Sequence, residues 1–428
     1  MLAPAILSLM ADVQPLRALK YAAGLDLSKA ICPPFDTISP ETQQKLYDRS
    51  PYNAIRIELA KEDGPGRYEN AAKALNQFVA EGTLIQDEEP AYYLHRHSFT
   101  AAGLEHTRRV LFARLRVTPW TDGEVLPHEQ TFGAPIEDRI QNMRATGINA
   151  SPVLMIYRDS GGTIGEILRG EGRRGSVEFP GDSGEHHSLA RIDGKAAAAL
   201  ARAFSGETLY IADGHHRYET AVTFGEEAKA QSTDWTGNDP ANFALVALAA
   251  ANDPGLVVLP IHRVTRGGDA WDDVIRRLGA MFNVAPVPDV TVAVAASEDA
   301  AFGLIAKDAD ADLLLTVKDP VAVNALLPAD RSAAWRALDY SIANHAIMQG
   351  CIGLTPEQMK EYKTVQFTAD SAEAVTSVRE RDAKYALIMK PISAGKVLEL
   401  ADAGERMPQK STFFYPKVPT GIVFNPVH

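Results

Sequence analysis

The sequence is poor in cysteine: Cys32 and Cys351 are the only two in 428 residues. They stand far apart and belong to neither a CxxC nor a Cys/His spacing, which argues against a disulfide scaffold and a cysteine-based zinc motif. No run of about 18 uncharged apolar residues occurs, so we expect no membrane span. Basic residues are also outnumbered, with 43 Lys and Arg against 55 Asp and Glu and a net charge of −12. This balance disfavours nucleic acid as a partner, because the chain as a whole repels a phosphate backbone.

Three familiar catalytic motifs are missing as well. The sequence has no Walker A ending in Gly-Lys-Ser/Thr, no GxGxxG after a strand and no Gly-x-Ser-x-Gly elbow. These absences argue against P-loop NTPases, NAD enzymes and serine hydrolases. The first residues lack a positively charged region, and Asp12 comes early, so we expect no signal peptide. Together with the few thiols, this favours a cytoplasmic protein.

The composition is that of a globular chain, with 46% hydrophobic and 23% charged residues. Its length suggests two or three domains. Patterns of both strands and helices predict an α/β (α+β) fold with mixed sheets. We expect three parts: an N-terminal α/β part over residues 1–95, a core over 96–267 and a C-terminal α/β domain over 268–428, where the composition becomes rich in Ala, Asp and Val.

Local patterns predict particular elements. Ser39 as cap and Pro40 at the first helical position predict a helix up to about Arg49. Apolar and polar residues alternate over 53–59, which predicts a strand, and residues 91–115 read as a hairpin. We interpret residues 161–184 as a loop or hairpin excursion and 397–400 as a short strand.

The sharpest local signal is an apolar strand that ends at Asp213 and is followed at once by a helix start. A helix N-terminus binds anions through its unpaired N–H groups and its partial positive charge. Gly214 lets the backbone approach a phosphate closely, and His215, His216 and Arg217 add donors. Asp213 could cap the helix, hold a metal ion or orient a hydroxyl. The alternative is that Asp213 is only a cap and the histidines are solvated or stacked.

Two further segments carry weaker signals. His128-Glu129 lacks the second histidine of a zincin helix, and a glutamate in a polar loop is usually only solvated. A role for Glu129 as a catalytic base requires that it lie near the phosphate turn. The segment 407–417 mixes Lys, Ser/Thr and aromatic residues. It could contact a phosphate or a base, but we favour a packed tail.

Four other histidines suit metal binding by type. His95 and His97 would share one face of a strand, but no third ligand is evident nearby. His186 and His187 are adjacent, and adjacent histidines rarely bind one ion together. We therefore expect no structural metal site at either pair.

Seven strings, in order along nearly the whole chain, resemble one widespread microbial family known mainly as a domain of unknown function. They are PPFD at 33–36, PYN at 51–53, PHEQT at 127–131, DRI at 138–140, IADGHHRYETA at 211–221, LPIHR at 259–263 and MPQKSTFFYPK at 407–417. The Asp-Gly-His-His-Arg core also resembles the phosphate-binding motif of the ParB/sulfiredoxin superfamily. Its closest version is that of free-serine kinases, which phosphorylate L-serine with ADP or ATP.

This resemblance implies a ParB/sulfiredoxin-like nucleotide-binding core over residues 96–267. By analogy, Gly214, His215, His216 and Arg217 would bind the phosphates of ATP or ADP. Asp213 would act in catalysis and hold Mg²⁺, His216 would also be catalytic, and Glu129 would be the base on the hydroxyl of serine or a similar small molecule. Glu129 lies 84 residues before Asp213, which is more than a compact kinase needs and implies an insertion.

Two alternatives stay open. The chain could be a non-catalytic, ParB-like regulatory protein that binds a nucleotide. ParB relatives bind CTP and DNA, but the sequence shows no helix-turn-helix and no basic stripe. A phosphatase or redox-type phosphoryl enzyme on the same loop is the third reading, and the lack of a cysteine in the turn argues against redox chemistry. Whether the protein forms a homo-oligomer also stays open.

Overall fold

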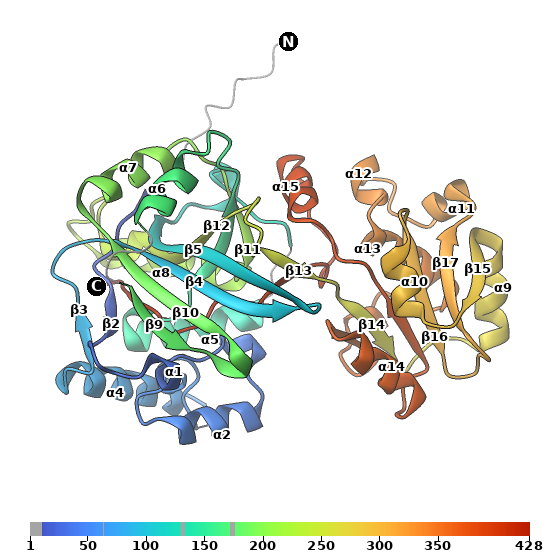
Figure 1. Cartoon of the computed structure of the whole chain (residues 1–428), viewed down its shortest axis with the longest axis horizontal. Helices are drawn as coiled ribbons and strands as arrows, with labels where there is room; N and C mark the ends of the chain where they lie inside the picture. Colours follow the sequence, from blue (N-terminus) through green and yellow to red (C-terminus); the bar gives the residue numbers. More distant parts are fainter. Residues whose placement is uncertain (1–10, 63, 130–132, 172–175) are drawn as a thin grey trace, which may run out of the picture. The chain divides into compact units, whose positions relative to one another are not determined.

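The computed structural model describes residues 11–62, 64–129, 133–171 and 176–428. Gln130 and Thr131 of the PHEQT string lie outside the described residues. The chain forms two compact units: one comprises residues up to Val257 together with Pro416–His428, and the other comprises Val258–Tyr415 (Figure 1). The finer division into parts 1–95, 96–267 and 268–428 stays a prediction.

The first unit is built on a mixed sheet whose strands run in the order β6-β11-β8-β12-β5-β4-β10-β9, with β1 paired to β5. Strand β8 is antiparallel to β11 but parallel to β12. The α/β class with mixed sheets predicted from the sequence is therefore confirmed. The strands of this unit are β1 (Val13–Gln14), β2 (Leu19–Tyr21), β3 (Leu84–Gln86), β4 (Tyr92–Ala101), β5 (Leu104–Arg116), β6 (Val125–Leu126), β7 (Ile148–Asn149), β8 (Val153–Tyr157), β9 (Val177–Pro180), β10 (His186–Ile192), β11 (Leu209–Asp213), β12 (Phe243–Ala250) and β21 (Asn425–Pro426).

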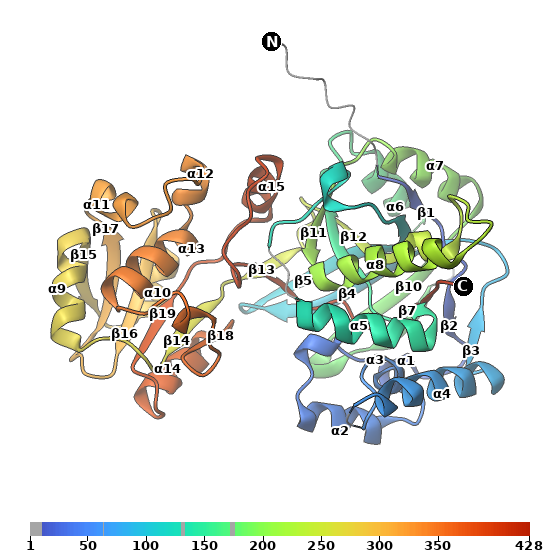
Figure 2. The ribbon, with the colours of Figure 1, turned by 180° about the vertical axis from the view of Figure 1, so that it is seen from behind.

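Helices cover both faces of this sheet. The helices of the unit are α1 (Leu27–Ala30), α2 (Pro40–Arg49), α3 (Ile55–Glu58), α4 (Gly66–Ala80), α5 (Gly133–Thr146), α6 (Thr163–Glu171), α7 (Gly194–Phe204) and α8 (His215–Gln231). Helices α6 and α7 pack Leu168, Leu200 and Phe204 against one face. Helices α5 and α8 run across the other face (Figure 2). Because both faces are covered, β12 is apolar along nearly its whole length and almost entirely buried.

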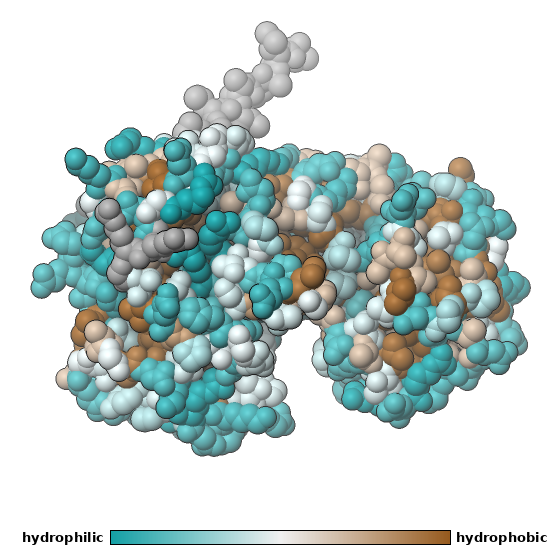
Figure 3. Space-filling model, in the orientation of Figure 1, coloured by the Kyte–Doolittle hydropathy of each residue, from teal (hydrophilic) through white to brown (hydrophobic). Residues whose placement is uncertain are grey.

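Two predicted features of the first unit are confirmed. Strands β4 and β5 form a long antiparallel hairpin, with Ala102 and Gly103 at its tip in left-handed conformations. Helix α2 begins at Pro40, and the hydroxyl of Ser39 accepts a hydrogen bond from the N–H of Thr42. Hydrophilic residues cover most of the face of this unit seen in Figure 3.

The predicted strand over residues 53–59 is wrong, because these residues form the short helix α3. Asn53 is buried, and its side-chain oxygen accepts from the N–H of Ile55 at 3.0 Å while its amide donates to the carbonyl oxygens of Lys29 and Ile31. These bonds begin a helical turn. Ile57 and Glu58 are adjacent in sequence and both buried, so the alternation seen in the sequence does not separate a buried face from an exposed one.

Two further predictions need correction. Residues 161–184 contain helix α6 before the β9–β10 hairpin, and the carboxylate of Asp159 caps that helix by accepting from the N–H groups of Ile164 and Gly165. The glycines of this segment favoured a loop in the sequence interpretation, although part of the segment forms a helix. Residues 397–400 lie in helix α15 (Ala394–Asp402), which Ser393 caps. Leu398 and Ala401 are buried there at helical spacing.

The second unit holds an antiparallel sheet with the strand order β15-β17-β16-β19-β14-β18. One core lies between this sheet and α9 with the π-helix Ala343–Cys351, and a smaller core lies between the other face and α10 with α14. The remaining elements are β13 (Val257–Leu259), β14 (His262–Thr265), α9 (Trp271–Met281), β15 (Phe282–Val287), α10 (Val290–Ala296), β16 (Ala301–Ala306), β17 (Asp312–Val317), α11 (Pro320–Ala325), α12 (Ala333–Arg336), α13 (Asp339–Ile342), β18 (Val365–Thr368), α14 (Ser371–Arg379), β19 (Tyr385–Ile388) and β20 (Phe413–Tyr415). Among the described residues of both units, no helix is long and apolar enough to cross a membrane.

Candidate functional site

The predicted strand–turn–helix is present. Strand β11 ends at Asp213, and α8 begins at His215 after the single residue Gly214. Gly214 has φ of 89°, in the left-handed region where a side chain costs about 1–2 kcal/mol. A Cβ at this position would also lie 2.9 Å from the guanidinium carbon of Arg217. The turn therefore requires glycine, and it places the first N–H groups of α8 at the end of the strand.

Asp213 lies between two cations. The ammonium of Lys417 donates to Oδ1 of Asp213, and Nη2 of Arg217 donates to Oδ2 at 2.6 Å. All three side chains are mostly buried. Burial alone would raise the pKa of Asp213, but the charges of Lys417 and Arg217 outweigh it and hold that pKa well below its ordinary value. The three groups together therefore carry one surplus positive charge at the N-terminus of α8.

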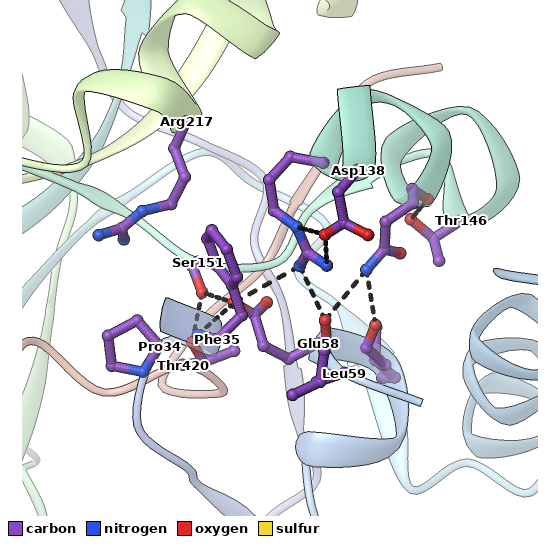
Figure 4. Close-up of polar contacts among 12 residues, drawn as sticks. Pro34, Phe35, Glu58, Leu59, Asp138, Thr146, Ser151, Arg217 and Thr420 are labelled. Atoms are coloured by element: carbon purple, nitrogen blue, oxygen red, sulfur yellow. Dashed lines mark hydrogen bonds and ion pairs between the residues drawn. The ribbon is translucent and has the colours of Figure 1, made fainter. Parts of the chain in front are cut away.

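Arg217 is oriented by protein acceptors. Besides its bond to Asp213, Nη1 of Arg217 donates to the carbonyl oxygen of Pro152. In Figure 4 this side chain reaches from α8 toward the segment that carries Ser151. Its guanidinium is thus held in place, and a phosphate at the turn would use its other N–H groups or replace one of these acceptors.

The loop that carries Glu129 lies against the turn. The main-chain N–H of His128 donates to Nε2 of His215 at 3.3 Å. Nδ1 of His128 donates to the carbonyl oxygen of Ile211 at 2.6 Å. Oε1 of Glu129 lies 4.0 Å from Nε2 of His128. The fold therefore brings Glu129 into the neighbourhood of the turn, although the two elements lie far apart in sequence.

The remaining predicted residue of the turn is His216. It lies in the first turn of α8, its side chain is half-buried, and its carbonyl oxygen accepts from the hydroxyl of Thr220 at 2.8 Å. Its contact with a phosphate stays a prediction.

Asp213 was also predicted to hold Mg²⁺. This ion prefers carboxylate oxygens and water as ligands. Each oxygen of Asp213 already accepts from a cation, and the carboxylate charge is neutralised by Lys417 and Arg217. The arrangement of these three residues therefore does not fit a magnesium ligand at Asp213.

Lys417 is the residue of this site that the sequence interpretation missed. The segment 407–417 packs as favoured, with Met407, Ser411 and Phe414 buried. Lys417, the last residue of this segment, instead contacts the turn through its ion pair with Asp213. The signal in the sequence is a lysine that directly follows Pro416 at the end of a mostly buried segment.

A second polar network lies beside the turn and centres on the buried carboxylate of Glu58 (Figure 4). Oε1 of Glu58 accepts from the main-chain N–H of Phe35 at 3.2 Å and from the hydroxyl of Ser151 at 2.5 Å. The hydroxyls of Ser151 and Thr420 lie 2.5 Å apart. This network connects four distant segments of the first unit.

Arg139 completes the network from α5. Its guanidinium lies 4.1 Å from the ring centre of Phe35, donates to the main-chain oxygen of Glu58 at 2.8 Å and pairs with Asp138. The PPFD and DRI strings of the sequence thus meet here. Their bonds are internal to the protein, which indicates a structural role.

A small cavity separates this network from the turn. Its volume is about 50 Å³, and Glu58, Arg139, Ser151, Arg217 and Thr220 are among its lining residues. That is room for a few water molecules. A nucleotide does not fit inside this cavity, so a nucleotide phosphate would have to approach the turn from outside it.

The solved structures that this chain is similar to include a conserved hypothetical protein from Pyrococcus furiosus, with 17% identity, a TM-score of 0.36, and 73% of this chain and 93% of that chain covered. A free serine kinase variant in complex with AMP has 15% identity and a TM-score of 0.36, with 73% and 92% covered. SbnI with a C-terminal truncation from Staphylococcus aureus has 11% identity and a TM-score of 0.35, with 69% and 82% covered. Similarity at this level assigns no activity.

No curated protein matches the chain. Residues 13–341 match the family described as "Protein of unknown function (DUF1015)". This match takes in most of the chain, including the Asp213–Arg217 turn and the loop of Glu129. The chain is a member of the DUF1015 family.

Proposed function

We propose that this protein binds a nucleotide through its phosphates at the Asp213–Arg217 turn and transfers a phosphoryl group to a small hydroxyl compound, with serine as the first candidate. The observation that carries the proposal is the convergence of Lys417 and Arg217 on Asp213 at the N-terminus of α8. A helix N-terminus beside two cations and one carboxylate attracts a polyphosphate. The likeness of the Asp-Gly-His-His-Arg core to a ParB/sulfiredoxin phosphate-binding motif supports the same ligand.

In the proposed reaction, the hydroxyl oxygen of the acceptor attacks the terminal phosphorus of the nucleotide. A new O–P bond forms while the bridging P–O bond breaks, so ATP leaves as ADP, or ADP leaves as AMP. Glu129 takes the hydroxyl proton, since its loop lies against the turn through the bond between His128 and His215. Lys417 and Arg217 neutralise charge on the phosphates, as phosphoryl transfer requires.

A magnesium ion is part of the family resemblance, and such an ion neutralises phosphate charge when bound to a nucleotide. Asp213 does not fit as its ligand here, so no step is assigned to the ion. Lys417 and Arg217 supply positive charge at the same place.

A nucleotide-binding regulatory protein without turnover is the second candidate. The ion pairs that hold Asp213 favour it, because they leave that carboxylate without a role as a metal ligand. Such a protein would use the same cations to bind phosphate, but Glu129 would have no chemical task.

The test is formation of phosphoserine by the purified chain with ATP or with ADP, followed in wild type, Glu129→Gln and Glu137→Gln. Glu137 is the matched control, since it is an exposed carboxylate on α5. We expect product with wild type and Glu137→Gln, and a loss of at least about 100-fold with Glu129→Gln. Nucleotide binding without product from serine, threonine or glycerol would support the regulatory protein. No nucleotide binding at all would overturn both candidates.

A further inference from the structure

Three metal-ligating side chains converge at one end of the sheet in the first unit. His97 on β4 and His187 on β10 are direct cross-strand partners, and their ring centres lie 4.1 Å apart. Glu185 lies in the turn between β9 and β10. Its Oε2 is 2.9 Å from Nε2 of His97 and 3.9 Å from Nε2 of His187. The ligand atoms of these three residues all lie within 4.8 Å of one another.

We propose that His97, Glu185 and His187 bind a divalent transition-metal ion, with zinc as the first candidate, and leave a fourth position open. Two atoms bound to one tetrahedral zinc ion at about 2.0–2.1 Å lie roughly 3.4 Å apart. The separations of 2.9 and 3.9 Å from Oε2 of Glu185 fall on either side of that value. Rotations of these side chains would bring the three ligand atoms, which all lie within 4.8 Å of one another, to that spacing. Two histidines and one carboxylate are a ligand set that holds zinc with one open position.

Gly181 leaves the space that such an ion needs. A Cβ at this position would lie 2.5 Å from Nε2 of His187 and 2.8 Å from the Cβ of Glu185. The backbone of Gly181, with φ of −101° and ψ of −171°, is one that any residue can adopt, so no turn geometry requires glycine here. Its N–H donates to the carbonyl oxygen of Glu185 at 2.8 Å, which holds the turn against the histidines. The missing side chain thus keeps the nitrogen of His187 open.

A third histidine, His95, contacts the ligand His187 on the side away from the proposed ion. Nε2 of His95 lies 3.0 Å from Nδ1 of His187. When Nε2 of His187 binds an ion, Nδ1 carries the proton and donates to His95. Metal-ligating histidines commonly use their second nitrogen in this way, which fixes the ring and its tautomer.

Packing alone does not account for this group of rings. His97 is 2% and His187 1% exposed, and His95 is fully buried. Nδ1 of His95 and of His97 are buried with no hydrogen-bond partner among the described residues. Buried polar atoms without a partner are rare in folded proteins. An ion at Nε2 of His97 and of His187 would not contact these Nδ1 atoms, but it would give the buried imidazoles a strong interaction that hydrophobic side chains in their place would not make.

Arg108 is a charged residue next to the proposed metal site, and its charge affects which ligand the ion would take. It pairs across the strands with His97, is fully buried, and its Nε and Nη2 have no partner among the described residues. The positive charge of Arg108 disfavours binding of a metal cation beside it, and the negative charge of the Glu185 carboxylate offsets this repulsion. A dication at the site would therefore favour an anionic oxygen, such as hydroxide or a carboxylate, at the open position.

The test uses the full chain, stripped of metal with a chelator and titrated with Zn²⁺ by calorimetry. We expect one equivalent to bind. His97→Ala, His187→Ala and Glu185→Gln should each weaken binding by more than about 100-fold, and His95→Phe by about 10–100-fold. His186→Ala is the matched control, because His186 is next in sequence but 54% exposed. Its affinity should stay within about twofold of wild type.

A second readout separates binding from folding. Co²⁺ in place of zinc should give the visible absorption of a tetrahedral ion without a thiolate band, since neither cysteine is in the set. Gly181→Ala should lose this spectrum. Thermal unfolding in the presence of chelator shows whether each variant is folded. Wild type that binds neither ion, or folded His97→Ala and His187→Ala that bind Zn²⁺ as tightly as wild type, would overturn the proposal.

Discussion

Lys417 and Asp213, which are 204 residues apart in the chain, form an ion pair at the N-terminal end of α8. Arg217 reaches the same carboxylate from one turn further along the helix. The pair ties the last segment of the first unit to the turn that the sequence marks as a phosphate site. The predictions about this turn depend on the balance of these three charges.

Removing one charge at a time should lower stability in both variants, but it should weaken phosphate binding only when a cation is removed. Lys417→Met leaves Asp213 and Arg217 as a neutral pair, so we expect a loss of about 1–2 kcal/mol in the free energy of unfolding and weaker ADP binding. Asp213→Asn leaves two cations facing each other, which should cost about 3–5 kcal/mol. That variant should still bind ADP at least as tightly as wild type.

Urea denaturation measures the free energy of unfolding of each variant, and calorimetry measures its affinity for ADP. Equal losses of ADP affinity in Lys417→Met and Asp213→Asn would contradict an electrostatic phosphate site at this turn.

Gly214→Ala should lose about 1–2 kcal/mol of stability, because its φ of 89° places a side chain in the left-handed region. Gly82→Ala is the matched control, with φ of 69° and no atom within 4 Å of the added Cβ. Both variants should lose similar stability from backbone strain. Gly214→Ala alone should also lose nucleotide binding, because its Cβ displaces Arg217. Similar binding in the two variants would show that the turn does not contact the ligand.

Glu58→Gln should destabilise the first unit by about 1–3 kcal/mol, because it removes a buried charge that faces Arg139. The exposed Glu69→Gln serves as control and should change stability by less than about 0.5 kcal/mol. Urea denaturation measures the free energy of unfolding of both variants. We expect ADP binding of folded Glu58→Gln to equal that of wild type, since the network bonds only within the protein. A folded variant that is fully stable but cannot bind ADP would assign Glu58 to the binding site instead.

The second unit should lose stability as the pH falls. Burial, and next the charge of Arg263, lower the pKa of His262 to about 4, and its Nδ1 accepts from the N–H of Met389 at 3.0 Å. An unfolded histidine has a pKa near 6.5. Between about pH 6.5 and 4 the unfolded chain therefore binds a proton that the folded chain does not, and stability falls with pH.

The loss from His262 alone is roughly 3 kcal/mol between pH 7 and 4. His262→Asn keeps an acceptor for Met389 but does not titrate, so its stability should fall less over the same range. Urea unfolding at several pH values measures both slopes, and equal slopes would show that His262 is not responsible.

The sequence predicted the elements whose signals are local. The cap at Ser39, the hairpin of β4 and β5, and the change from strand to helix around Gly214 each depend on neighbouring residues. The helix at 55–58 was mistaken for a strand, because it depends on the bonds of Asn53 to Lys29 and Ile31, which only the fold brings together.

The same limit applies to the candidate sites. The Asp213–Arg217 turn was visible as one string, but Lys417 reaches it from the far end of the chain. The sequence showed no third ligand for His95 and His97, and it gave no reason to combine His97 with His187, which was considered only with its neighbour His186. Glu185 lies two residues before His187, yet it reaches His97 only because β4 and β10 pair. Contacts between residues far apart in sequence were thus the part that could not be predicted.

The most direct test of the phosphate site compares ATP, ADP and adenosine in calorimetric titrations of the wild-type chain. If the turn binds phosphate, ATP and ADP should bind at least about tenfold more tightly than adenosine, and this preference should shrink as salt screens Lys417 and Arg217. Adenosine that binds as tightly as ADP, or no binding of any of the three, would contradict a phosphate site at the start of α8.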